Sequence, residues 1–392
     1  MRGWESGEIA LFGHFMYQLA ARLRYKPENY VRLFLDSRTI PTCLRSEPLL
    51  DDPTFAIVAP WVGRQEILRP GDAETTERLS EFDVAIVTDL GPIFAERSMT
   101  PFVFFPGGWD LTRAPFPVRS RLTRRRGLAD LVEAVLAIGQ RRGIRGAASI
   151  WAPAFTPFRR AVDRLGLELG GCLPQAIDTD LFTPGQPTLR STSDSWTLTI
   201  FHPARFMFTP DPFLIETGGW KRNDLLVRGF ASAVGIGLDG RLVLIERESS
   251  PDERLARDLI DDLGIGSRVD WLGTGSGVEF TRREVAELYR SCDVSSDDFG
   301  GWFGLATLEG ASSGRPVLNW LEPDVMAAEY PDGHPFVRVA DADQICAAIL
   351  ELGDPERRLE IGQASREWVM VHHDRRVVAR RCEHMLGELG LA

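Results

Sequence analysis

Short apolar runs alternate with longer amphipathic segments along the first half of the chain. The apolar runs lie at 30–37, 82–90, 101–108 and 147–153, and the amphipathic segments at 14–24, 128–143 and 157–165. Runs that are apolar at nearly every position are typical of parallel strands, because helices cover both faces of such a sheet. The pattern therefore predicts strands at the apolar runs and helices at the amphipathic segments.

The second half repeats this alternation more regularly. It begins after a polar segment at 183–195 that is rich in Pro, Gly and Ser and has the composition of a linker. The predicted strands lie at 196–205, 241–248, 268–273, 293–296, 315–320 and 336–340, and the predicted helices at 222–234, 251–263, 282–291, 304–313, 323–329 and 341–352. Two final helices are expected between 355 and 391. Such a strand–helix repeat predicts a doubly wound parallel sheet.

The length and the linker together indicate two domains. A chain of 392 residues suits two domains of about 150–200 residues each. We expect an α/β protein with two tandem Rossmann-like, doubly wound parallel-sheet domains, over 1–190 and 191–372, and a C-terminal helix over 373–392 that packs back on the first domain. Ligands of such sheets bind at the carboxyl ends of strands, so functional residues are expected in loops that follow strands and face an interdomain cleft.

Charge and composition exclude several classes of protein. The net charge of −11 argues against a general nucleic-acid-binding protein, because a polyanion would be repelled. The five cysteines contain no C-x-x-C pair, and the adjacent His372 and His373 would point in different directions on a helix, so no metal site is expected. No apolar run reaches the roughly 18–20 residues that span a bilayer, and the N-terminus is acidic where a signal peptide is basic. A cytoplasmic protein is expected.

The loop at 297–304 carries the clearest chemical signal. It is rich in glycine and leads into the predicted helix 304–313, so backbone N–H groups and the helix dipole favour an anion such as a diphosphate there. Glu309 falls on the inward stripe of this helix, where a carboxylate needs hydrogen-bond donors. The hydroxyls of a ribose would supply them. The alternative is that Glu309 bonds to backbone or pairs with an arginine.

The segment GWFGLATLEGASSGRPVL, at 301–318, resembles the signature of retaining GT-B glycosyltransferases, in the large family that includes sucrose- and phosphatidylinositol-type enzymes. That signature has two glutamates around a G-F-G-like core. The second falls on Glu309, and the first falls on Gly301, where this chain departs from the pattern. We expect Asp297 or Asp298 to supply the missing carboxylate.

Two further segments fit this family. FHPAR at 201–205 ends a predicted strand, and WKRND at 220–224 precedes a predicted helix. The resemblance implies that Arg205 and Lys221 contact the donor diphosphate, where fixed cations stabilise the charge on the leaving group. For Arg205 alone, a plain surface arginine is the alternative.

The resemblance implies a donor site, an acceptor loop and a set of catalytic residues. The donor site comprises Arg205, Lys221, Gly273, Asp298, Gly301, Phe303, Gly304, Leu305 and Glu309, with the backbone of GTGSG at 273–277 holding the base. The acceptor loop, within 104–116, comprises Gly108, Trp109, Asp110 and Arg113. Arg205, Lys221, Glu309 and Asp110 are expected to be catalytic, with Asp110 orienting an acceptor hydroxyl. The alternative for Asp110 is a capping residue in a plain turn. His14 is also expected to face the donor.

The implied activity is transfer of a sugar from a nucleotide-diphosphate donor to an acceptor hydroxyl with retention of configuration. UDP is the foremost candidate for the donor nucleotide and GDP the second; no metal or other cofactor is expected. The acceptor is a small molecule, a saccharide or a lipid-linked molecule, and the basic cluster at 119–126 is either a weak membrane contact or a solvated loop. The alternatives are a pseudo-glycosyltransferase, a sugar-nucleotide epimerase, or a catalytically silent nucleotide-binding scaffold.

Overall fold

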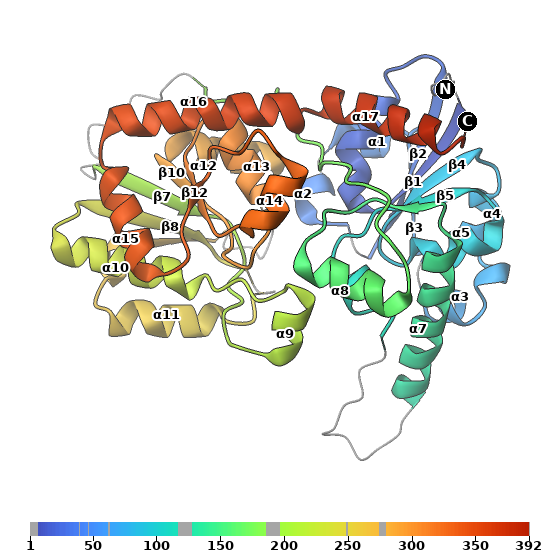
Figure 1. The fold of residues 1–392 in the computed structure, drawn as a ribbon, viewed down its shortest axis with the longest axis horizontal. Coiled ribbons are helices and arrows are strands. Elements are labelled where there is room, and N and C mark those ends of the chain that lie inside the picture. Colours follow the sequence, from blue (N-terminus) through green and yellow to red (C-terminus); the bar gives the residue numbers. More distant parts are fainter. Residues whose placement is uncertain are drawn as a thin grey trace. The chain divides into compact units, whose positions relative to one another are not determined.

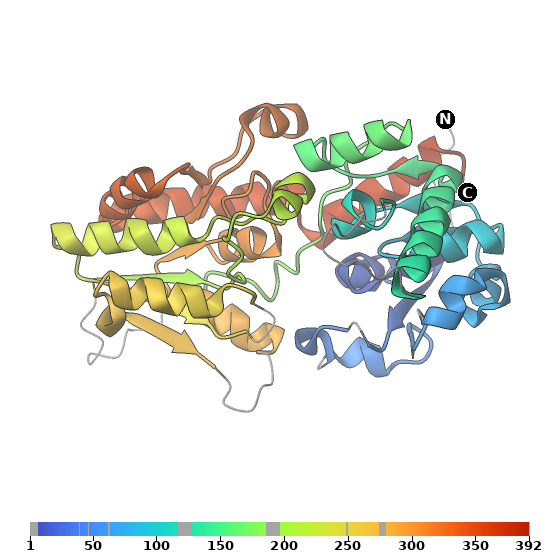
Figure 2. The same cartoon turned by 90° about the horizontal axis from the view of Figure 1, so that it is seen from below.

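The computed structural model describes residues 7–38, 40–45, 47–61, 63–116, 128–185, 197–247, 250–273 and 280–391. The chain forms two compact units (Figures 1 and 2). The first unit comprises Met1–Ala176 together with Val378–Ala392, and the second comprises Ile177–Val377.

The first unit is built on a parallel sheet of six strands in the order β3-β2-β1-β4-β5-β6. The strands are β1 (Gly7–Phe12), β2 (Asn29–Asp36), β3 (Ala56–Ala59), β4 (Val84–Val87), β5 (Phe102–Phe104) and β6 (Ser149–Ile150). The apolar pattern predicted β2, β4, β5 and β6. It missed β1, which follows a short charged segment at the N-terminus, and the four-residue β3.

Helices cover both faces of the first sheet. They are α1 (Tyr17–Leu23), α2 (Thr42–Arg45), α3 (Arg64–Leu68), α4 (Glu74–Leu79), α5 (Gly91–Ser98), α6 (Trp109–Thr112), α7 (Leu128–Gly146) and α8 (Thr156–Leu165). The C-terminal helix α17 (Arg375–Glu388) lies beside α1 (Figure 1). Its Val378, Cys382 and Leu386 are buried in the same core as the inward side chains of α1 and of the central strands.

The second unit has a six-stranded parallel sheet in the order β12-β11-β10-β7-β8-β9. The strands are β7 (Leu198–His202), β8 (Gly240–Ile245), β9 (Val269–Leu272), β10 (Val294–Ser296), β11 (Val317–Asn319) and β12 (Val337–Arg338). All six lie at predicted strands, so the two doubly wound parallel sheets expected from the sequence are confirmed.

Successive side chains of the second sheet enter two separate cores. Leu242 and Leu244 of β8 pack with one set of helices, and Val243 and Ile245 pack with the other. The first set is α10 (Asp224–Ile236), α11 (Glu253–Asp262) and α15 (Ala342–Glu351), and the second is α12 (Arg282–Ser291), α13 (Leu305–Ser312) and α16 (Pro355–His372). The short helices α9 (Pro212–Thr217) and α14 (Pro323–Glu329) complete the unit. Burial on both faces explains why β8 is apolar at every position from Leu242 to Ile245.

Both sheets have the same strand order, which fixes where ligands are expected. In the first sheet the order reverses between β1 and β4, and in the second between β7 and β10. At such a switch point the two following loops run in opposite directions and leave a crevice at the carboxyl edge. The loops after β1, β4, β7 and β10 therefore border the two crevices where ligands are expected.

The chain passes into the second unit ahead of the boundary placed at residue 190. Ile177 pairs with Asp374 in a parallel bridge, and Phe182 is completely buried in a core of the second unit. These contacts place 177–185 in the second unit, although the polar composition begins at 183. Within the described residues, no helix is both long and apolar enough to cross a membrane.

Candidate functional site

A buried histidine fixes the loop that follows β7. His202 is completely buried, with Nδ1 2.9 Å from Ser296 Oγ of β10 and Nε2 3.1 Å from Asn223 Nδ2. Asn223 Nδ2 also donates to the carbonyl of Arg205 at 2.8 Å. Burial lowers the pKa of His202 to about 3 despite the opposing charge of Asp297. The neutral imidazole therefore positions the Arg205 loop by hydrogen bonding.

Arg205 and Lys221 both lie near this switch point, Arg205 after β7 and Lys221 ahead of α10. Arg205 is exposed, and its charge is near enough to Lys221 to act on the pKa of that ammonium. Lys221 Nζ lies 2.6 Å from Asp298 Oδ2, in the loop after β10. Burial lowers the pKa of Lys221, but the Asp298 carboxylate outweighs this effect and the net direction is upward. Lys221 is therefore charged, and its first partner is a carboxylate of the protein itself.

Asp297 caps the helix that was expected to seat a diphosphate. Its Oδ2 accepts from Gly304 N–H at 2.9 Å, from Thr307 N–H at 3.2 Å and from the Thr307 hydroxyl at 2.9 Å. The first N–H groups of a helix have no intrahelical acceptor. This cap uses those of Gly304 and Thr307, and within the described residues no group accepts from those of Leu305 and Ala306. Fewer backbone N–H groups are therefore available to bind an anion than the sequence implied.

Glu309 is half-buried on α13, one turn beyond this cap. Tyr289 OH lies 3.5 Å from Glu309 Oε2 and is closer, at 3.0 Å, to the carbonyl of Ala306. Burial raises the pKa of Glu309 to about 7, although the charges of Arg282 and Arg247 oppose the shift. The carboxylate therefore lies in a crowded environment with one long contact to a donor, and hydroxyl donors from a ligand would stabilise its charged form.

The position of the missing first glutamate is held by a glycine in a conformation that side chains disfavour. Gly301 has φ 117°, its N–H donates to Trp320 O at 3.2 Å, and its carbonyl accepts from Glu322 N–H at 2.7 Å. A residue with a Cβ is strained at such a φ. The backbone conformation at position 301 therefore favours glycine over the glutamate of the family's pattern.

Two other expected donor residues have mainly structural surroundings. The side chain of Phe303 is 4% exposed and packs among Tyr330, Phe336 and Trp368 in the core. A contribution of Phe303 to a donor site would therefore come from its backbone. Gly273 follows β9 beside Glu246, and the rest of the GTGSG segment lies outside the described residues.

The loops after β1 and β4 approach closely at the switch point of the first sheet. Gly13 has φ 109°, and a Cβ there would lie 1.9 Å from Thr88 Oγ1, so only glycine fits. Asp89 follows β4 with φ 52°, which is uncommon for a residue other than glycine. A strained backbone at a switch point is typical of a functional position.

A carboxylate, an imidazole and an indole meet at this crevice. Asp89 accepts hydrogen bonds from the side chains of Thr88, at 3.3 Å, and of Trp109. Burial raises the pKa of Asp89, while the neighbouring His14 opposes the shift. Among the described residues no group bonds to His14 Nδ1, although this atom is buried. Trp109 is 47% exposed, so its ring is accessible to a ligand.

Asp110 has a different role from the one expected. Its carboxylate is 0% exposed and accepts from four backbone N–H groups, those of Asp89 at 2.8 Å, Gly107 at 3.0 Å, Gly108 at 2.8 Å and Leu111 at 3.1 Å. Burial raises its pKa to about 7 against the effect of these bonds. Contact with an acceptor hydroxyl would require this carboxylate to leave its four donors. Asp110 therefore positions the loops of Asp89 and Gly108, which corrects the expectation of direct contact.

The remaining acceptor residues lie on the outside of this loop. Gly108 has φ 134° and precedes α6, and Arg113 is exposed just after α6. The basic cluster at 119–126 lies outside the described residues. In the part of the chain that the structure describes, no group of three or more His, Cys, Asp or Glu side chains could hold a metal ion.

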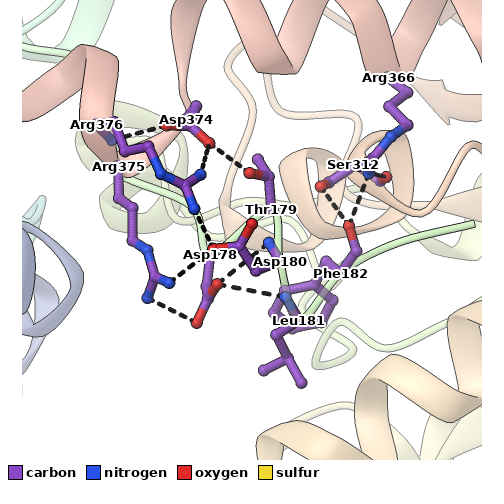
Figure 3. Close-up of polar contacts among 10 residues, drawn as sticks. All are labelled: Asp178, Thr179, Asp180, Leu181, Phe182, Ser312, Arg366, Asp374, Arg375 and Arg376. Atoms are coloured by element: carbon purple, nitrogen blue, oxygen red, sulfur yellow. Dashed lines mark hydrogen bonds and ion pairs between the residues drawn. The ribbon is translucent and has the colours of Figure 1, made fainter.

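The last turn of α13 is fixed to the segment by which the chain enters the second unit (Figure 3). Ser312 Oγ donates to the carbonyl of Phe182 at 2.6 Å, and Arg366 Nη1 donates to the same carbonyl at 3.0 Å and to that of Ser312. The helix that carries Glu309 is thereby held at both ends, by Asp297 at its start and by Phe182 at its end.

The same segment is cross-linked to the residues just before the chain leaves the second unit (Figure 3). Arg375 binds Asp178 at 2.9 Å and Asp180 at 3.0 Å. Asp374 accepts from Arg376 at 3.0 Å and from the Thr179 hydroxyl. The segment that enters the second unit and the segment that leaves it are therefore joined by ion pairs and hydrogen bonds, and the entering segment also bonds to α13.

Sequence reasoning missed two residues of these crevices. Asp89 was placed inside the strand predicted at 82–90, and Arg247 inside the strand predicted at 241–248, but β4 ends at Val87 and β8 ends at Ile245. Each lies two residues after the end of a buried strand. A charged residue at the end of an otherwise apolar run was the signal that could have marked them.

Comparison with known proteins agrees with the fold and extends across the chain. No protein-family model and no curated protein sequence matches it. Anabaena HepE, solved in complex with UDP and glucose, has a TM-score of 0.64 at 15% identity, over 97% of this chain and 100% of HepE. Sucrose-phosphate synthase from Thermosynechococcus elongatus has a TM-score of 0.64 at 14% identity, over 98% of this chain and 99% of the synthase.

A third similar structure belongs to another class of enzyme. A Listeria monocytogenes structure described as a UDP-N-acetylglucosamine 2-epimerase has a TM-score of 0.55 at 12% identity, over 96% of this chain and 95% of the epimerase. At these identities the similarity establishes the fold and leaves the reaction to be argued from the site. The chain has the GT-B fold of two Rossmann-like units, in common with HepE and sucrose-phosphate synthase.

Proposed function

We propose that the chain is a glycosyltransferase that moves a sugar from a nucleotide-diphosphate donor to an acceptor hydroxyl, with retention of anomeric configuration. One observation carries the proposal: Arg205, Lys221 and the unclaimed N–H groups at the start of α13 converge on the switch point of the second sheet, with Glu309 one turn away. Cations and helix N–H groups favour a diphosphate, and a carboxylate near them suits ribose hydroxyls.

These groups would act on the leaving diphosphate. When the bond between the sugar carbon and the phosphate oxygen breaks, its electron pair goes to the diphosphate. Lys221, Arg205 and the N–H groups of Leu305 and Ala306 would stabilise that charge more strongly than the ground state, which lowers the barrier. The ion pair of Lys221 with Asp298 requires the ammonium to share its charge between a carboxylate and a phosphate.

Asp298 is our candidate for the carboxylate that is missing at Gly301. Asp297 is occupied by the cap of α13, whereas Asp298 points to Lys221 and accepts one backbone N–H, from Gly300 at 3.2 Å. We expect Asp298→Asn to reduce selectivity among donor sugars more than affinity for the free nucleoside diphosphate. Equal behaviour of this variant and the parent with every donor would reject this role.

The first unit would supply the acceptor side. Asp89 lies at the β1–β4 crevice. Its carboxylate accepts a hydrogen bond from the side chain of Trp109, which is exposed. It would orient an acceptor hydroxyl, while the Trp109 ring would pack against the apolar face of a sugar. His14 lies beside Asp89 and is the second polar group available to a substrate.

UDP is the foremost candidate for the donor nucleotide, because HepE was solved with UDP and glucose. GDP is the second candidate. We expect no metal ion to be needed, because the cations and the helix start would neutralise the diphosphate. A sugar-nucleotide epimerase is the second candidate function, favoured by the fold shared with the Listeria structure. A pseudo-glycosyltransferase and a silent nucleotide-binding scaffold complete the alternatives.

The test is to incubate the purified chain with UDP- and GDP-hexoses, with and without saccharide acceptors, and to follow nucleotide and sugar by mass spectrometry and NMR. We expect release of the nucleoside diphosphate and a product with the anomeric configuration of the donor. Conversion of the donor sugar without release of nucleotide would indicate the epimerase. Binding without any reaction would indicate the scaffold.

A further inference from the structure

An arginine that the proposed function does not use lies on the loop after β8. β7 pairs with β8 along its whole length, from Leu198 with Gly240 to His202 with Leu244. The carboxyl ends of these two parallel strands therefore lie at one edge. Arg247 follows β8 on that edge, as Arg205 follows β7.

The two loops are bonded to each other. Phe206 N–H donates to Ser250 Oγ at 2.8 Å, and Ser250 N–H donates to the carbonyl of Arg247 at 2.8 Å. Asp252 adds bonds from the N–H groups of Phe208 at 2.6 Å and Thr209 at 2.8 Å. Arg247 is consequently held beside the Arg205 loop by a continuous set of short contacts.

The carboxylates near Arg247 in sequence form ion pairs with a different arginine. Arg257 pairs with Glu246 at 2.7 Å and with Glu253 at 3.0 Å, while its guanidinium lies 3.9 Å from the centre of the Trp271 ring. Glu253 contacts Arg247 only at its backbone, accepting the N–H at 2.8 Å. Among the described residues, no carboxylate forms an ion pair with Arg247, and its Nε is buried without an acceptor.

In the part of the chain that the structure describes, this half-buried guanidinium pairs with no anion, which leaves its hydrogen bonding incomplete. Acidic residues outnumber basic ones, 56 to 45, so a carboxylate partner would be easily supplied if the role were structural. Buried polar groups are nearly always hydrogen-bonded in native proteins, and an exception calls for an explanation such as a bound ion. The guanidinium geometry, with its fork of donors, fits a phosphate.

We propose that Arg247 is a third phosphate-binding cation of the second unit, which binds the diphosphate of a nucleotide sugar together with Arg205 and Lys221. This inference rests on the proposed function and deepens it. A third cation would also offset the negative charge already present at this site. Asp298 pairs with Lys221, and Asp297 accepts hydrogen bonds at the start of α13. A further cation restores the positive charge that a diphosphate requires.

Arg247 is also close enough to Glu309 to favour its charged form. The other charged or titratable groups around Glu309 are Arg282, Asp297 and Tyr289. Removal of Arg247 would leave Glu309 harder to ionise, so any nucleotide affinity that depends on the Glu309 carboxylate would shift to higher pH.

The test uses the full chain and its variants Arg247→Gln and Arg247→Lys, titrated calorimetrically with UDP, UMP and uridine, and with the GDP series, between pH 6 and pH 8.5. We expect Arg247→Gln to weaken UDP or GDP binding about 10- to 100-fold, the usual effect of losing a hydrogen bond to a charged group, and to weaken the nucleoside little. Arg247→Lys should recover part of the loss, and it serves as the test if the glutamine variant does not fold.

Arg241 is a matched control, because it lies at the opposite end of the same strand, pairs with Asp270 at 3.1 Å, and also has a buried Nε without an acceptor. Arg241→Gln should leave nucleotide binding unchanged. If the parent binds the diphosphate and Arg247→Gln binds it equally well, the inference is wrong. An equal loss for diphosphate and nucleoside in Arg247→Gln would also overturn it. If the parent binds no nucleoside diphosphate at all, the proposed function itself fails.

Discussion

The carboxyl edges of the two sheets share one topology and differ in their charges. The first edge presents Asp89 and His14 beside an exposed Trp109, with the carboxylate of Asp110 buried beneath them. The second presents the cations Arg205, Lys221 and Arg247, set against the carboxylates of Asp297, Asp298 and Glu309. One strand order thus carries two kinds of chemistry, because the loops and not the sheet determine what binds.

The difference also separates two ways of holding a carboxylate. Asp110 and Asp297 are satisfied by backbone N–H groups and shape their loops. Asp298, Glu309 and Asp89 depend on side chains and are the ones that a ligand would affect. If the second edge binds the donor and the first binds the acceptor, variants of Asp298 and Glu309 should change nucleotide binding. A variant of Asp89 should change turnover with the acceptor and leave nucleotide binding unchanged.

The largest effect is expected from Lys221→Ala. Losing one charge-assisted contact to a leaving group costs roughly 3–4 kcal/mol, or about 10²–10³ in turnover. The structure adds that the carboxylate of Asp298 loses its partner, so the variant should also be less stable, by about 1–3 kcal/mol. Turnover with a sugar nucleotide and a melting curve for each variant provide the measurement.

The double variant Lys221→Ala with Asp298→Asn separates these two effects. It should recover most of the lost stability, because no unpaired carboxylate remains, without recovering turnover. Recovery of turnover along with stability would show that Lys221 acts only through folding.

A smaller loss, about 10²-fold in turnover, is expected for Asp89→Asn, with nucleotide affinity unchanged. Orientation and proton transfer at an acceptor hydroxyl contribute about this much, and asparagine tolerates the left-handed backbone at φ 52°. Parallel steady-state kinetics and calorimetry test the separation. A fall in nucleotide affinity equal to the fall in turnover would show that the first edge has no acceptor role of its own.

Glu309→Gln should weaken nucleotide binding about 10- to 100-fold while stabilising the fold at alkaline pH. Because the pKa of Glu309 is raised to about 7 in the folded chain, the unfolded chain loses this proton first. Stability therefore falls as pH rises from the ordinary carboxyl range to about 7, and this loss is absent in the glutamine variant. Melting curves at pH 5 and pH 8 should show a gain only at pH 8.

Nucleotide affinity should follow the opposite course in the parent. If the charged Glu309 accepts ribose hydroxyls, affinity for the nucleoside, which has no titrating phosphate, rises between pH 6 and pH 8 and is flat in Glu309→Gln. An identical pH profile for the two proteins would remove Glu309 from the site.

The smallest effect is expected from removal of divalent cations. If the cations and the start of α13 neutralise the diphosphate, EDTA should leave turnover nearly unchanged. Activity that is lost with EDTA and restored by magnesium or manganese would contradict this expectation and point to the neighbouring carboxylates Asp297 and Asp298.

The architecture was predictable where strands of the second unit are buried on both faces and correspondingly apolar, as in β8. Leu242–Ile245 illustrates this, since alternate residues enter two different cores. The first unit was less regular. The apolar run of β1 is short and follows charged residues, so its place at the centre of the sheet depends on its pairing with β2 and β4, which no local pattern shows.

The candidate site was predictable in its residue types but not in its partners. Arg205, Lys221 and Glu309 stand out because the family resemblance and the strand ends coincide. The pairing of Lys221 with Asp298, the cap formed by Asp297 and the burial of Asp110 depend on loops that are distant in sequence. Asp110 and Asp298 both lie in loops or turns that follow buried strands, β5 and β10, and only tertiary contacts distinguish the fully buried carboxylate from the partly exposed one.

The most direct test of the central claim is a calorimetric titration of the purified parent, and of the double variant Lys221→Ala with Glu309→Gln, with UDP and GDP. The account predicts saturable binding of at least one nucleoside diphosphate to the parent, with loss of that binding in the double variant. Absence of binding to the parent, or equal binding to both proteins, would contradict a nucleotide-diphosphate site at the carboxyl edge of the second sheet.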